Sequence, residues 1–301
     1  MLFRSALLFI SLTVTNLSNY WQSRSIAEEK TIELEQSKLS LLKHEIEGEL
    51  ENHLKNLLTL HDVPPVKAII RARANHGIDP KNGDTLQQWR ERLTVIFLAF
   101  LKTHPDYQQI RYIDVASNEL VRVQITPDGS GRVVADKDLQ NKIKSPYVTE
   151  TLKLKPGEAY YSDVTLNREQ GVIQIPHLPL LRMATPVHIK NNQVTGLIVI
   201  NSATEKLFSV IHSEENGLQR SIVDDKGYFI KHDNPSITFG LERGINYRFQ
   251  DFEEGLAAYV ASNDQYFRRH TEHYHELEGF QKIYFSPNDS SRYWLLTLNI
   301  P

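Results

Sequence analysis

The chain has 301 residues and a mass of 34.7 kDa, which predicts two modules, or one module with a long accessory element. Hydrophobic residues make up 40% and charged residues 24%, a composition that supports hydrophobic cores and excludes a disordered chain. A net charge of -3 provides no large positive field, which argues against nucleic acid as a partner. The absence of cysteine excludes disulfides, thiolate nucleophiles and iron–sulfur clusters.

Residues 1–23 resemble a membrane-directed segment. Residues 5–23 follow Arg4 without a charge, and Tyr20 and Trp21 stand where an interfacial aromatic pair would lie. Polar residues dilute the segment, so it is marginal for a bilayer of roughly 30 Å. Three interpretations stay open: an uncleaved inner-membrane anchor, a cleaved signal peptide and a buried helix. The anchor is favoured because no small-x-small cleavage site precedes Arg24.

Residues 24–63 are predicted to form one long helix. Apolar side chains recur at intervals of three or four, while Glu and Lys fill the other faces. The apolar positions are Leu39, Leu42, Ile46, Leu50, Leu54 and Leu57. Such a helix spans about 50 Å and ends before Pro64 and Pro65. We expect it to be a spine that packs on the rest of the chain and also pairs with its copy in a homodimer.

Shorter helices and then strands follow this spine. Helices are predicted at residues 66–75 and 86–103, separated by turn signals. Residues 110–115 and 120–126 indicate a β-hairpin. Further elements are expected in chain order: a short helix at 147–154, strands at 159–165, 172–175, 181–189 and 195–201, and a linking helix at 205–213.

The second part of the chain repeats the pattern of the first about a hundred residues later. Residues 111–114 with their turn and return strand resemble residues 220–229, and the hairpin at 186–201 resembles 282–299. The repeat predicts two tandem modules, a larger one at 64–203 and a smaller one at 204–301. The expected fold class is therefore α+β, with a long N-terminal helix followed by two modules built on antiparallel sheets.

Common catalytic signatures are absent: the sequence has no Walker loop, dinucleotide fingerprint, nucleophile elbow or His-Glu-x-x-His helix. The densest imidazole group is His270, His273 and His275 with Glu272 and Glu276, ligand types that suit zinc or nickel. Neither a strand nor a helix presents all three histidines on one face. A solvated loop or strand edge is therefore favoured, and we expect no metal and no cofactor.

Residues 160–187 combine aromatic side chains with Arg, Asp, Glu and Asn. Polar groups at a sheet edge beneath a loop can capture a small polar ligand. An Arg presents a bidentate fork to a carboxylate, whereas Asp, Asn or Tyr can meet an ammonium or a hydroxyl group. The alternative is an ordinary exposed strand whose loops carry salt bridges.

These features together resemble the double Cache sensor domain, a tandem of PAS-like modules found outside the membrane in bacterial histidine kinases, chemoreceptors and diguanylate cyclases. The resemblance covers nearly the whole chain. Its most specific stretches are Ile110-Arg111-Tyr112-Ile113-Asp114, Tyr161-Ser162-Asp163 and Arg182-x-x-Thr185-Pro186-Val187. It implies that module 64–203 is membrane-distal and holds a ligand between its sheet and the capping helices and loops, and that module 204–301 is membrane-proximal.

The sequence departs from the amino-acid-binding branch of that family. Those members carry an Arg-x-Trp-Tyr element, of which Lys144-Ser145-Pro146-Tyr147 keeps only the tyrosine, and a Tyr-x-Asp element, which Thr165-Leu166-Asn167 replaces. The pair that clamps an amino acid is therefore missing, and a small carboxylate is favoured instead. The candidate ligand-binding residues are Arg122, Tyr147, Asn167 and Arg182, followed by Tyr161 and Asp163.

The leading hypothesis is a periplasmic, ligand-sensing and non-catalytic region of an inner-membrane receptor that serves a histidine kinase or a diguanylate cyclase. Its expected partners are a small molecule, the membrane and a second copy of the chain, without nucleic acid. We expect the output domain to lie beyond residue 301. The rival hypotheses are a non-signalling solute-binding or adhesion module and a metal-dependent enzyme built on the histidine cluster.

Overall fold

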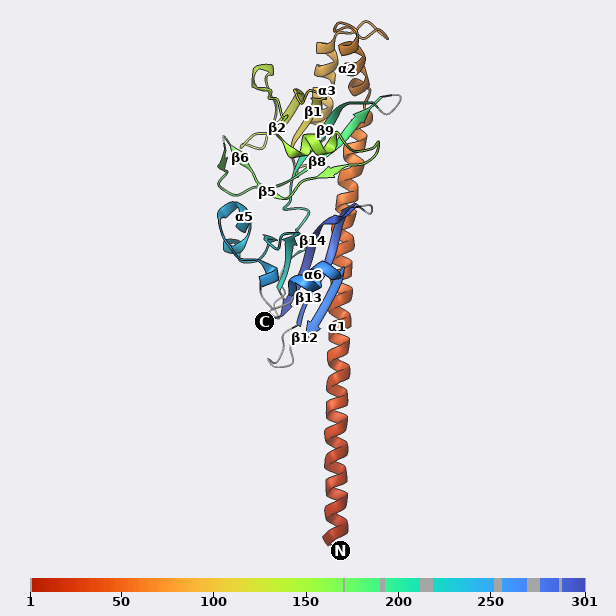
Figure 1. The fold of residues 1–301 in the computed structure, drawn as a ribbon, viewed down its shortest axis with the longest axis vertical. Coiled ribbons are helices and arrows are strands. Elements are labelled where there is room, and N and C mark those ends of the chain that lie inside the picture. The colour runs from red at the N-terminus through yellow and green to blue at the C-terminus, as the bar shows by residue number, and fades with distance from the viewer. Residues whose placement is uncertain are drawn as a thin grey trace.

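The computed structural model describes residues 2–169, 171–189, 193–211, 219–251, 256–269, 277–286 and 289–300. Helix α1 (Leu2–Asp62) runs past both sheets, and its N-terminal part projects beyond them (Figure 1). No helix within these ranges combines the length and the apolar character of a membrane span.

The apolar face predicted for the spine is the face of α1 that packs on the sheets. Its innermost residues are at most 4% exposed: Leu39, Ile46, Leu50, Leu57 and Leu60. Leu42 and Leu54 are partly buried beside them. This spacing explains why one helix contacts two sheets, because the same stripe continues along several turns.

Two helices cover the end of the molecule where α1 stops (Figure 1). Helix α2 (Pro64–Ala74) has a proline in its first turn, where the missing N–H costs nothing. Helix α3 (Leu86–Thr103) begins at a capping box, in which the Gln88 N–H donates to Thr85 Oγ1 at 3.2 Å and the Thr85 N–H donates to Gln88 Oε1 at 2.8 Å. Both helices match their predicted ranges closely.

The first sheet has the strand order β3-β2-β1-β9-β8-β4, and β5 also pairs with β8. Its strands are β1 (Tyr107–Asp114), β2 (Glu119–Ile125), β3 (Gly131–Val133), β4 (Tyr160–Tyr161), β5 (Thr165–Leu166), β8 (Pro179–His188) and β9 (Val194–Ala203). Helices α1 and α3 cover one face. The opposite face, here called the outer face, packs on α4 (Pro146–Thr151).

The second sheet has the order β11-β10-β14-β13-β12. Its strands are β10 (Gln219–Asp224), β11 (Phe229–Lys231), β12 (Gln265–Arg269), β13 (Leu277–Ser286) and β14 (Asp289–Ile300). The remaining elements are the hairpin of β6 (Arg168–Glu169) and β7 (Val172–Ile173), helices α5 (Gly240–Arg243) and α6 (Leu256–Ser262), and 3-10 turns at Asp136–Asp138, Pro235–Ile237 and Phe249–Asp251.

The two sheets repeat one topology, which explains the similarity within the sequence. The order β2-β1-β9-β8 in the first sheet corresponds to β11-β10-β14-β13 in the second. Asp114 and Asp224 end the matching strands, and each carboxylate accepts a backbone N–H four residues ahead at 2.8 Å. The positive φ of this turn falls on Ser117 (68°) in the first sheet and on Gly227 (92°) in the second.

The prediction of a linking helix at residues 205–213 is wrong for the part that the structure describes, because residues 205–210 form successive turns. The Phe208 N–H donates to Thr204 O, but the next N–H groups, of Ser209 and Ile211, donate to carbonyls three residues back. Leu207, Phe208 and Ile211 are buried in the core. Tertiary packing of these side chains overrides the helical pattern.

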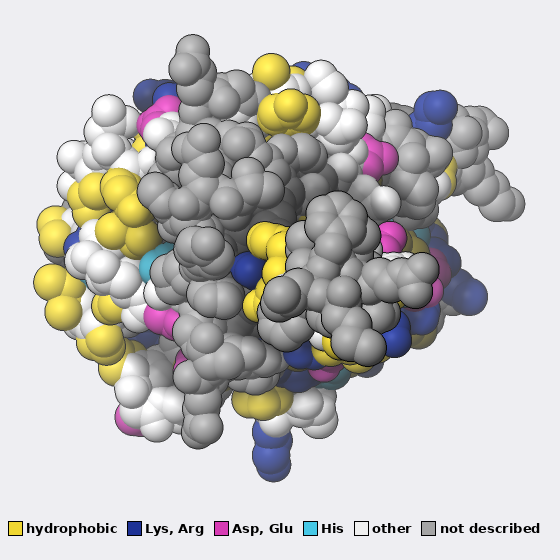
Figure 2. All heavy atoms as spheres, turned by 90° about the horizontal axis from the view of Figure 1, so that it is seen from below, with side chains coloured by type: hydrophobic (Ala, Val, Ile, Leu, Met, Phe, Trp, Pro, Cys, Tyr) yellow, Lys and Arg dark blue, Asp and Glu magenta, His cyan; other side chains and the backbone are white. Residues whose placement is uncertain are grey.

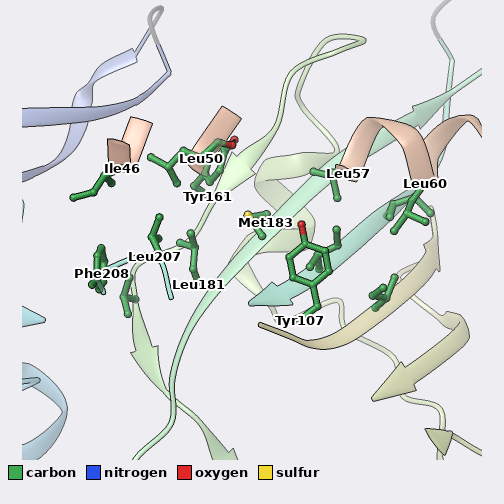
Figure 3. Packing of buried hydrophobic residues seen from close by; sticks show 14 of the residues in the cluster. Ile46, Leu50, Leu57, Leu60, Tyr107, Tyr161, Leu181, Met183, Leu207 and Phe208 are labelled. Carbon is green, nitrogen blue, oxygen red and sulfur yellow. The ribbon is translucent and has the colours of Figure 1, made fainter. Parts of the chain in front are cut away.

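One hydrophobic core runs along α1 and includes residues from both sheets. Figure 3 shows Leu207 and Phe208 of the linking segment beside Ile46 of α1 and Leu181 of β8. Phe208 also meets Trp294 of β14 edge to face, with ring centroids 5.1 Å apart. The two sheets therefore share buried contacts, although the boundaries 64–203 and 204–301 remain an interpretation.

Candidate ligand site

Three arginines lie on the outer face of the first sheet. Arg111 of β1 and Arg122 of β2 are direct cross-strand partners, and Arg182 lies on β8 opposite Asn201 of β9. Successive side chains of a strand point to opposite faces of the sheet. Tyr112 faces the core that packs on α1, so its neighbour Arg111 faces the outer side. Like charges directly opposite each other destabilise a sheet, so this arrangement favours a functional role.

Each guanidinium is held by a neutral partner. Arg111 Nη1 donates to the Tyr147 hydroxyl of α4 at 2.6 Å, and Arg182 Nη1 donates to Thr165 Oγ1 of β5 at 2.6 Å. Arg122 Nη2 donates to Gln124 Oε1 at 2.8 Å. These bonds orient the arginines without neutralising their charges.

One buried carboxylate, Glu119, lies beside two of the arginines. Its oxygens are 3.8 Å from Arg111 Nε and 3.6 Å from Arg122 Nη1, and its side chain has no exposed surface. The Gln140 N–H also donates to Glu119 Oε2 at 3.0 Å. Glu119 and Gln140 also line a surface cleft of about 330 Å³, together with Arg90 and Asp136.

Positive charge is crowded at this face. Burial lowers the pKa of the Arg122 and Arg182 guanidinium groups, and the charge of Arg111 lowers both further. Burial and then Arg111 likewise lower the pKa of the Lys142 ammonium. In contrast, acidic and basic side chains are interspersed on the surface seen in Figure 2. The four residues Arg111, Arg122, Arg182 and Lys142 are called the cation cluster below.

Buried polar atoms on this face have no hydrogen-bond partner in the protein. They are Arg111 Nε, Arg122 Nε and Asn201 Oδ1, and Glu119 Oε1 also has none. Arg111 is 6% exposed and Asn201 is 5% exposed. Buried polar groups are nearly always satisfied, so these atoms are where a bound polar ligand would complete the hydrogen bonding.

The second sheet differs at the same face, which is filled by its own apolar side chains. Its cluster contains Val223, Phe229, Phe249, Phe280 and Leu295 together with two residues of α6. By the correspondence of Asp114 with Asp224, Ser221 stands where the first sheet has Arg111. The second outer face therefore offers hydrophobic packing and no cationic group at that position.

The structure brings three of the six candidate residues together at this face: Arg122, Tyr147 and Arg182. Asn167 lies just past β5, where its side-chain amide donates to Gln174 Oε1 at 2.7 Å. Tyr161 lies on the opposite face, beside Leu50 of α1 (Figure 3), and its ring stacks on Phe285.

Asp163 lies at the junction between the two sheets. Its carboxylate accepts from Arg292 Nη2 of β14 at 2.5 Å and from Lys226 Nζ, in the turn after β10, at 2.7 Å. A second contact is nearby, because the Leu166 N–H donates to Glu242 Oε1 of α5 at 2.7 Å. Residues 163–166 thus join Arg182, through Thr165, to the second sheet and its helix α5.

Sequence reasoning missed five residues of this face: Arg111, Glu119, Lys142, Tyr160 and Asn201. The predicted hairpin, with its turn at residues 116–119, would place Arg111 opposite Gln124, whereas the observed register, with its irregularity between Tyr112 and Ile113, places it opposite Arg122. Tyr160 pairs with Ala184 and so shares the outer face, whereas Tyr161 pairs with Met183 of the core. No local pattern distinguishes these adjacent tyrosines.

The described residues contain no group of three or more potential metal ligands. The cluster of His270, His273 and His275 lies outside the described residues, so the structure does not test it.

In sequence, residues 83–251 match the family described as bacterial histidine kinase, sensor domain. The chain belongs to this sensor domain family. A sensor domain is not itself an enzyme, as expected from the missing catalytic signatures. A search of curated proteins found no match.

Solved structures agree with this sensor domain in fold. The extracellular domain of the putative histidine kinase vpHK1S-Z8 is 18% identical, with a TM-score of 0.72 over 90% of this chain and 95% of that chain. A domain of a sensory box/GGDEF family protein from Vibrio parahaemolyticus is also 18% identical, with a TM-score of 0.65 over 88% and 96% of the two chains.

A third neighbour of the sensor domain is the ligand-binding domain of the Pseudomonas aeruginosa amino acid chemoreceptor PctC, in complex with GABA. It is 12% identical, with a TM-score of 0.52 over 88% of this chain and 97% of that chain. The α+β fold with a long N-terminal helix and antiparallel sheets is therefore confirmed as a sensor fold, consistent with the double Cache type.

Proposed function

We propose that this sensor domain binds a small polar, anionic ligand at the outer face of its first sheet. The observation that supports this most directly is the cation cluster, where the buried Nε donors of Arg111 and Arg122 make no hydrogen bond within the protein. The apolar filling of the second outer face favours the first sheet as the binding module. Three of the candidate residues, Arg122, Tyr147 and Arg182, are part of this proposed site.

A thermal-shift screen tests ligand binding. The full chain is heated with single members of a panel of small carboxylates, phosphates, amino acids and neutral sugars. An anion present at a hundred times its dissociation constant should stabilise the chain by about 2.7 kcal/mol. Arg182→Gln should abolish that stabilisation, because it removes a cation without emptying the core.

The control is Arg132→Gln, since Arg132 is an exposed arginine of β3. Stabilisation by a neutral sugar alone, or by an anion equally well in Arg182→Gln, would contradict the proposed site.

Signalling is proposed to pass from this site to the second sheet and along α1. Arg182 holds Thr165, and the adjoining residues contact the second sheet and its helix α5 through Asp163 and Leu166. A ligand that pulls Arg182 away from Thr165 would therefore disturb the junction. We propose that the receptor carries a histidine kinase or cyclase output, with the sensor domain outside the cytoplasm.

The projecting part of α1 is proposed to contact the membrane. Its apolar side chains are largely exposed, at 58–62% for the set Leu12, Val14, Leu17, Tyr20 and Trp21. A bilayer would cover such side chains. Recovery of the full chain in the membrane fraction after an alkaline wash would support this, and recovery in the soluble fraction would oppose it.

The proposed homodimer uses another part of α1. Leu34 is 55% exposed and Leu41 is 69% exposed, and seven residues separate them, so they share one face. The chain has no cysteine, so Leu41→Cys introduces a single thiol. Mild oxidation should yield a disulfide-linked dimer. Glu29→Cys, on another face of the helix, is the control, and equal yields from both variants would contradict this interface.

A further inference from the structure

The turn after β10 holds a carboxylate that has no positively charged partner among the described residues. Asp224 ends β10, and its Oδ1 accepts the backbone N–H of Lys226 at 3.0 Å and that of Tyr228 at 2.8 Å. No described lysine, arginine or histidine side chain forms an ion pair with this carboxylate. The side chain is also partly buried, so water compensates its charge only in part.

The matching turn of the first sheet does have such a partner. Asp114 accepts the Asn118 N–H at 2.8 Å in the same way, but its other oxygen lies 2.8 Å from Nη1 of Arg73 on α2. One backbone turn therefore carries a neutralised carboxylate in the first sheet and an uncompensated one, Asp224, in the second. Since the turn is the same, its geometry does not require the missing cation.

The environment of Asp224 changes its titration. Burial is the largest cause and raises the pKa of this carboxyl to about 6, although the two backbone hydrogen bonds oppose the change. An aspartate in an unfolded chain has a pKa of about 3.9. The folded protein therefore takes up a proton at Asp224 in mildly acidic solution, in which an ordinary aspartate stays ionised.

Five charged groups meet at this turn, where the two sheets join. The turn provides Asp224, Asp225 and Lys226, the first sheet provides Asp163, and β14 provides Arg292. Asp163 accepts from Lys226 Nζ at 2.7 Å and from Arg292 Nη2 at 2.5 Å. Asp225 lies within electrostatic reach of the other first-sheet and β14 charges. Three carboxylates thus share two cations, and one proton taken up by Asp224 balances the charges.

The other titratable groups packed on this turn leave that balance unchanged. Two are the phenols of Tyr228 and Tyr293, which carry no charge in neutral or acidic solution. Burial, followed by the charge of Asp225, raises the pKa of Tyr293 further. The third is Arg248, whose backbone pairs with that of Tyr228 and whose guanidinium lies 2.7 Å from Asp251.

We propose that residues 224–228 are a proton-sensitive element that strengthens the junction between the two sheets in mildly acidic solution. Uptake of a proton by Asp224 removes the excess negative charge beside Lys226. Asp163 stays ionised in this range because its pKa is lowered, so its contact with Lys226 is kept. The protein then responds to acidity through its second sheet, independently of the proposed ligand site on the first.

The raised folded-state pKa fixes the sign of the pH dependence. The folded form binds the proton of Asp224 before the unfolded form does, so this group adds stability as the pH falls through about 6. Between pH 7.5 and pH 5 the equilibrium constant for opening of the turn should decrease about tenfold. Asp163 has the opposite sign, but it loses its contribution only at lower pH.

Hydrogen exchange of the full chain at pH 5 and pH 7.5, corrected for intrinsic exchange rates, tests the proposal. In the wild type, residues 224–231 and residues 160–169 should be about tenfold better protected at pH 5. Asp224→Asn resembles the protonated acid, so it should remove this difference. Urea unfolding of the same variant at pH 7.5 should show higher stability than the wild type, because no carboxylate has to be buried in its ionised form.

Two further variants serve as controls. Asp114→Asn is the same change in the matching turn, and it should lower stability at both pH values, because it leaves Arg73 without that carboxylate. Lys226→Met removes the link from the turn to Asp163. Residues 224–231 should then keep their pH dependence, while residues 160–169 should lose it.

Three results would overturn the proposal. The first is equal protection of the wild type at both pH values, and the second is a pH dependence that persists unchanged in Asp224→Asn. The third is a wild-type response confined to residues 224–231, which would show that the turn does not act on the junction. Each measurement is made without ligand, so none of these results bears on the proposed function.

Discussion

Replacing Glu35 by glutamine is expected to lower the free energy of unfolding by about 3–5 kcal/mol, the usual cost of breaking a buried ion pair by removing one of its two charges. Glu35 of α1 lies 3.2 Å from Arg220 Nη2 of β10, and the two side chains are 6% and 4% exposed. The variant keeps the volume but removes the negative charge. The Arg220 guanidinium then stays buried without that carboxylate, between the spine and the second sheet.

Urea unfolding at neutral pH measures this effect. The matched control is Glu33→Gln, an exposed position two residues earlier on the same helix, which should change stability by less than about 0.5 kcal/mol. A loss below about 1 kcal/mol for Glu35→Gln would mean that water or local rearrangement replaces the ion pair, because exposed pairs contribute only that much. The pair would then not fix α1 on the second sheet.

Asp163→Asn is expected to loosen the junction between the sheets at a cost of about 1–2 kcal/mol, because two charge-assisted hydrogen bonds in a partly exposed site are weakened. Arg292 and Lys226 both belong to the second sheet and its turn, whereas Asp163 belongs to the first. Hydrogen exchange should therefore become faster on both sides, at residues 160–169 and at residues 224–231.

The control for the junction is Asp251→Asn, which breaks an ion pair with Arg248 inside the second module. This variant should speed hydrogen exchange near residues 248–251 and leave the exchange of residues 160–169 unchanged. Faster exchange confined to residues 160–169 in Asp163→Asn would contradict a junction that couples the sheets.

The same contact predicts a pH dependence. Burial alone would raise the pKa of the Asp163 carboxyl, but the hydrogen bond from Lys226 and the charges of Arg292 and Lys226 outweigh it and lower the pKa. A lowered folded-state pKa means that the contribution to stability is present above the unfolded value of about 3.9 and is lost as the pH falls through the folded value. Asp163→Asn should accordingly flatten the acid side of the stability profile.

Much of the fold could be predicted from local patterns. The apolar stripe on α1 indicated its length and its buried face, and turn signals separated the helices and strands with small errors at their ends. The internal repeat indicated two modules, which the matching strand orders explain. The linking segment was predicted wrongly because Leu207, Phe208 and Ile211 satisfy a helical pattern while packing as turns in the shared core.

The candidate site was only partly predictable. Arg122, Tyr147 and Arg182 were recognised as polar residues in plausible places, and they do converge on one face. Asp163 is also a polar residue in a similar sequence context, but it contacts the second sheet instead. Residue type alone cannot separate these cases, because an ion pair across a junction and a ligand contact use the same chemistry.

The sequence by itself determined the helical spine, the two related modules, the near-neutral charge and the absence of cysteine chemistry, since each follows from composition or from periodicity over a few residues. Only the tertiary structure decided that Arg111 joins Arg182 across β9, that Tyr160 rather than Tyr161 shares their face, and that the second outer face is filled by phenylalanines. The physical reason is that these features depend on which strands pair and in which register, and both are set by contacts between residues far apart in the chain.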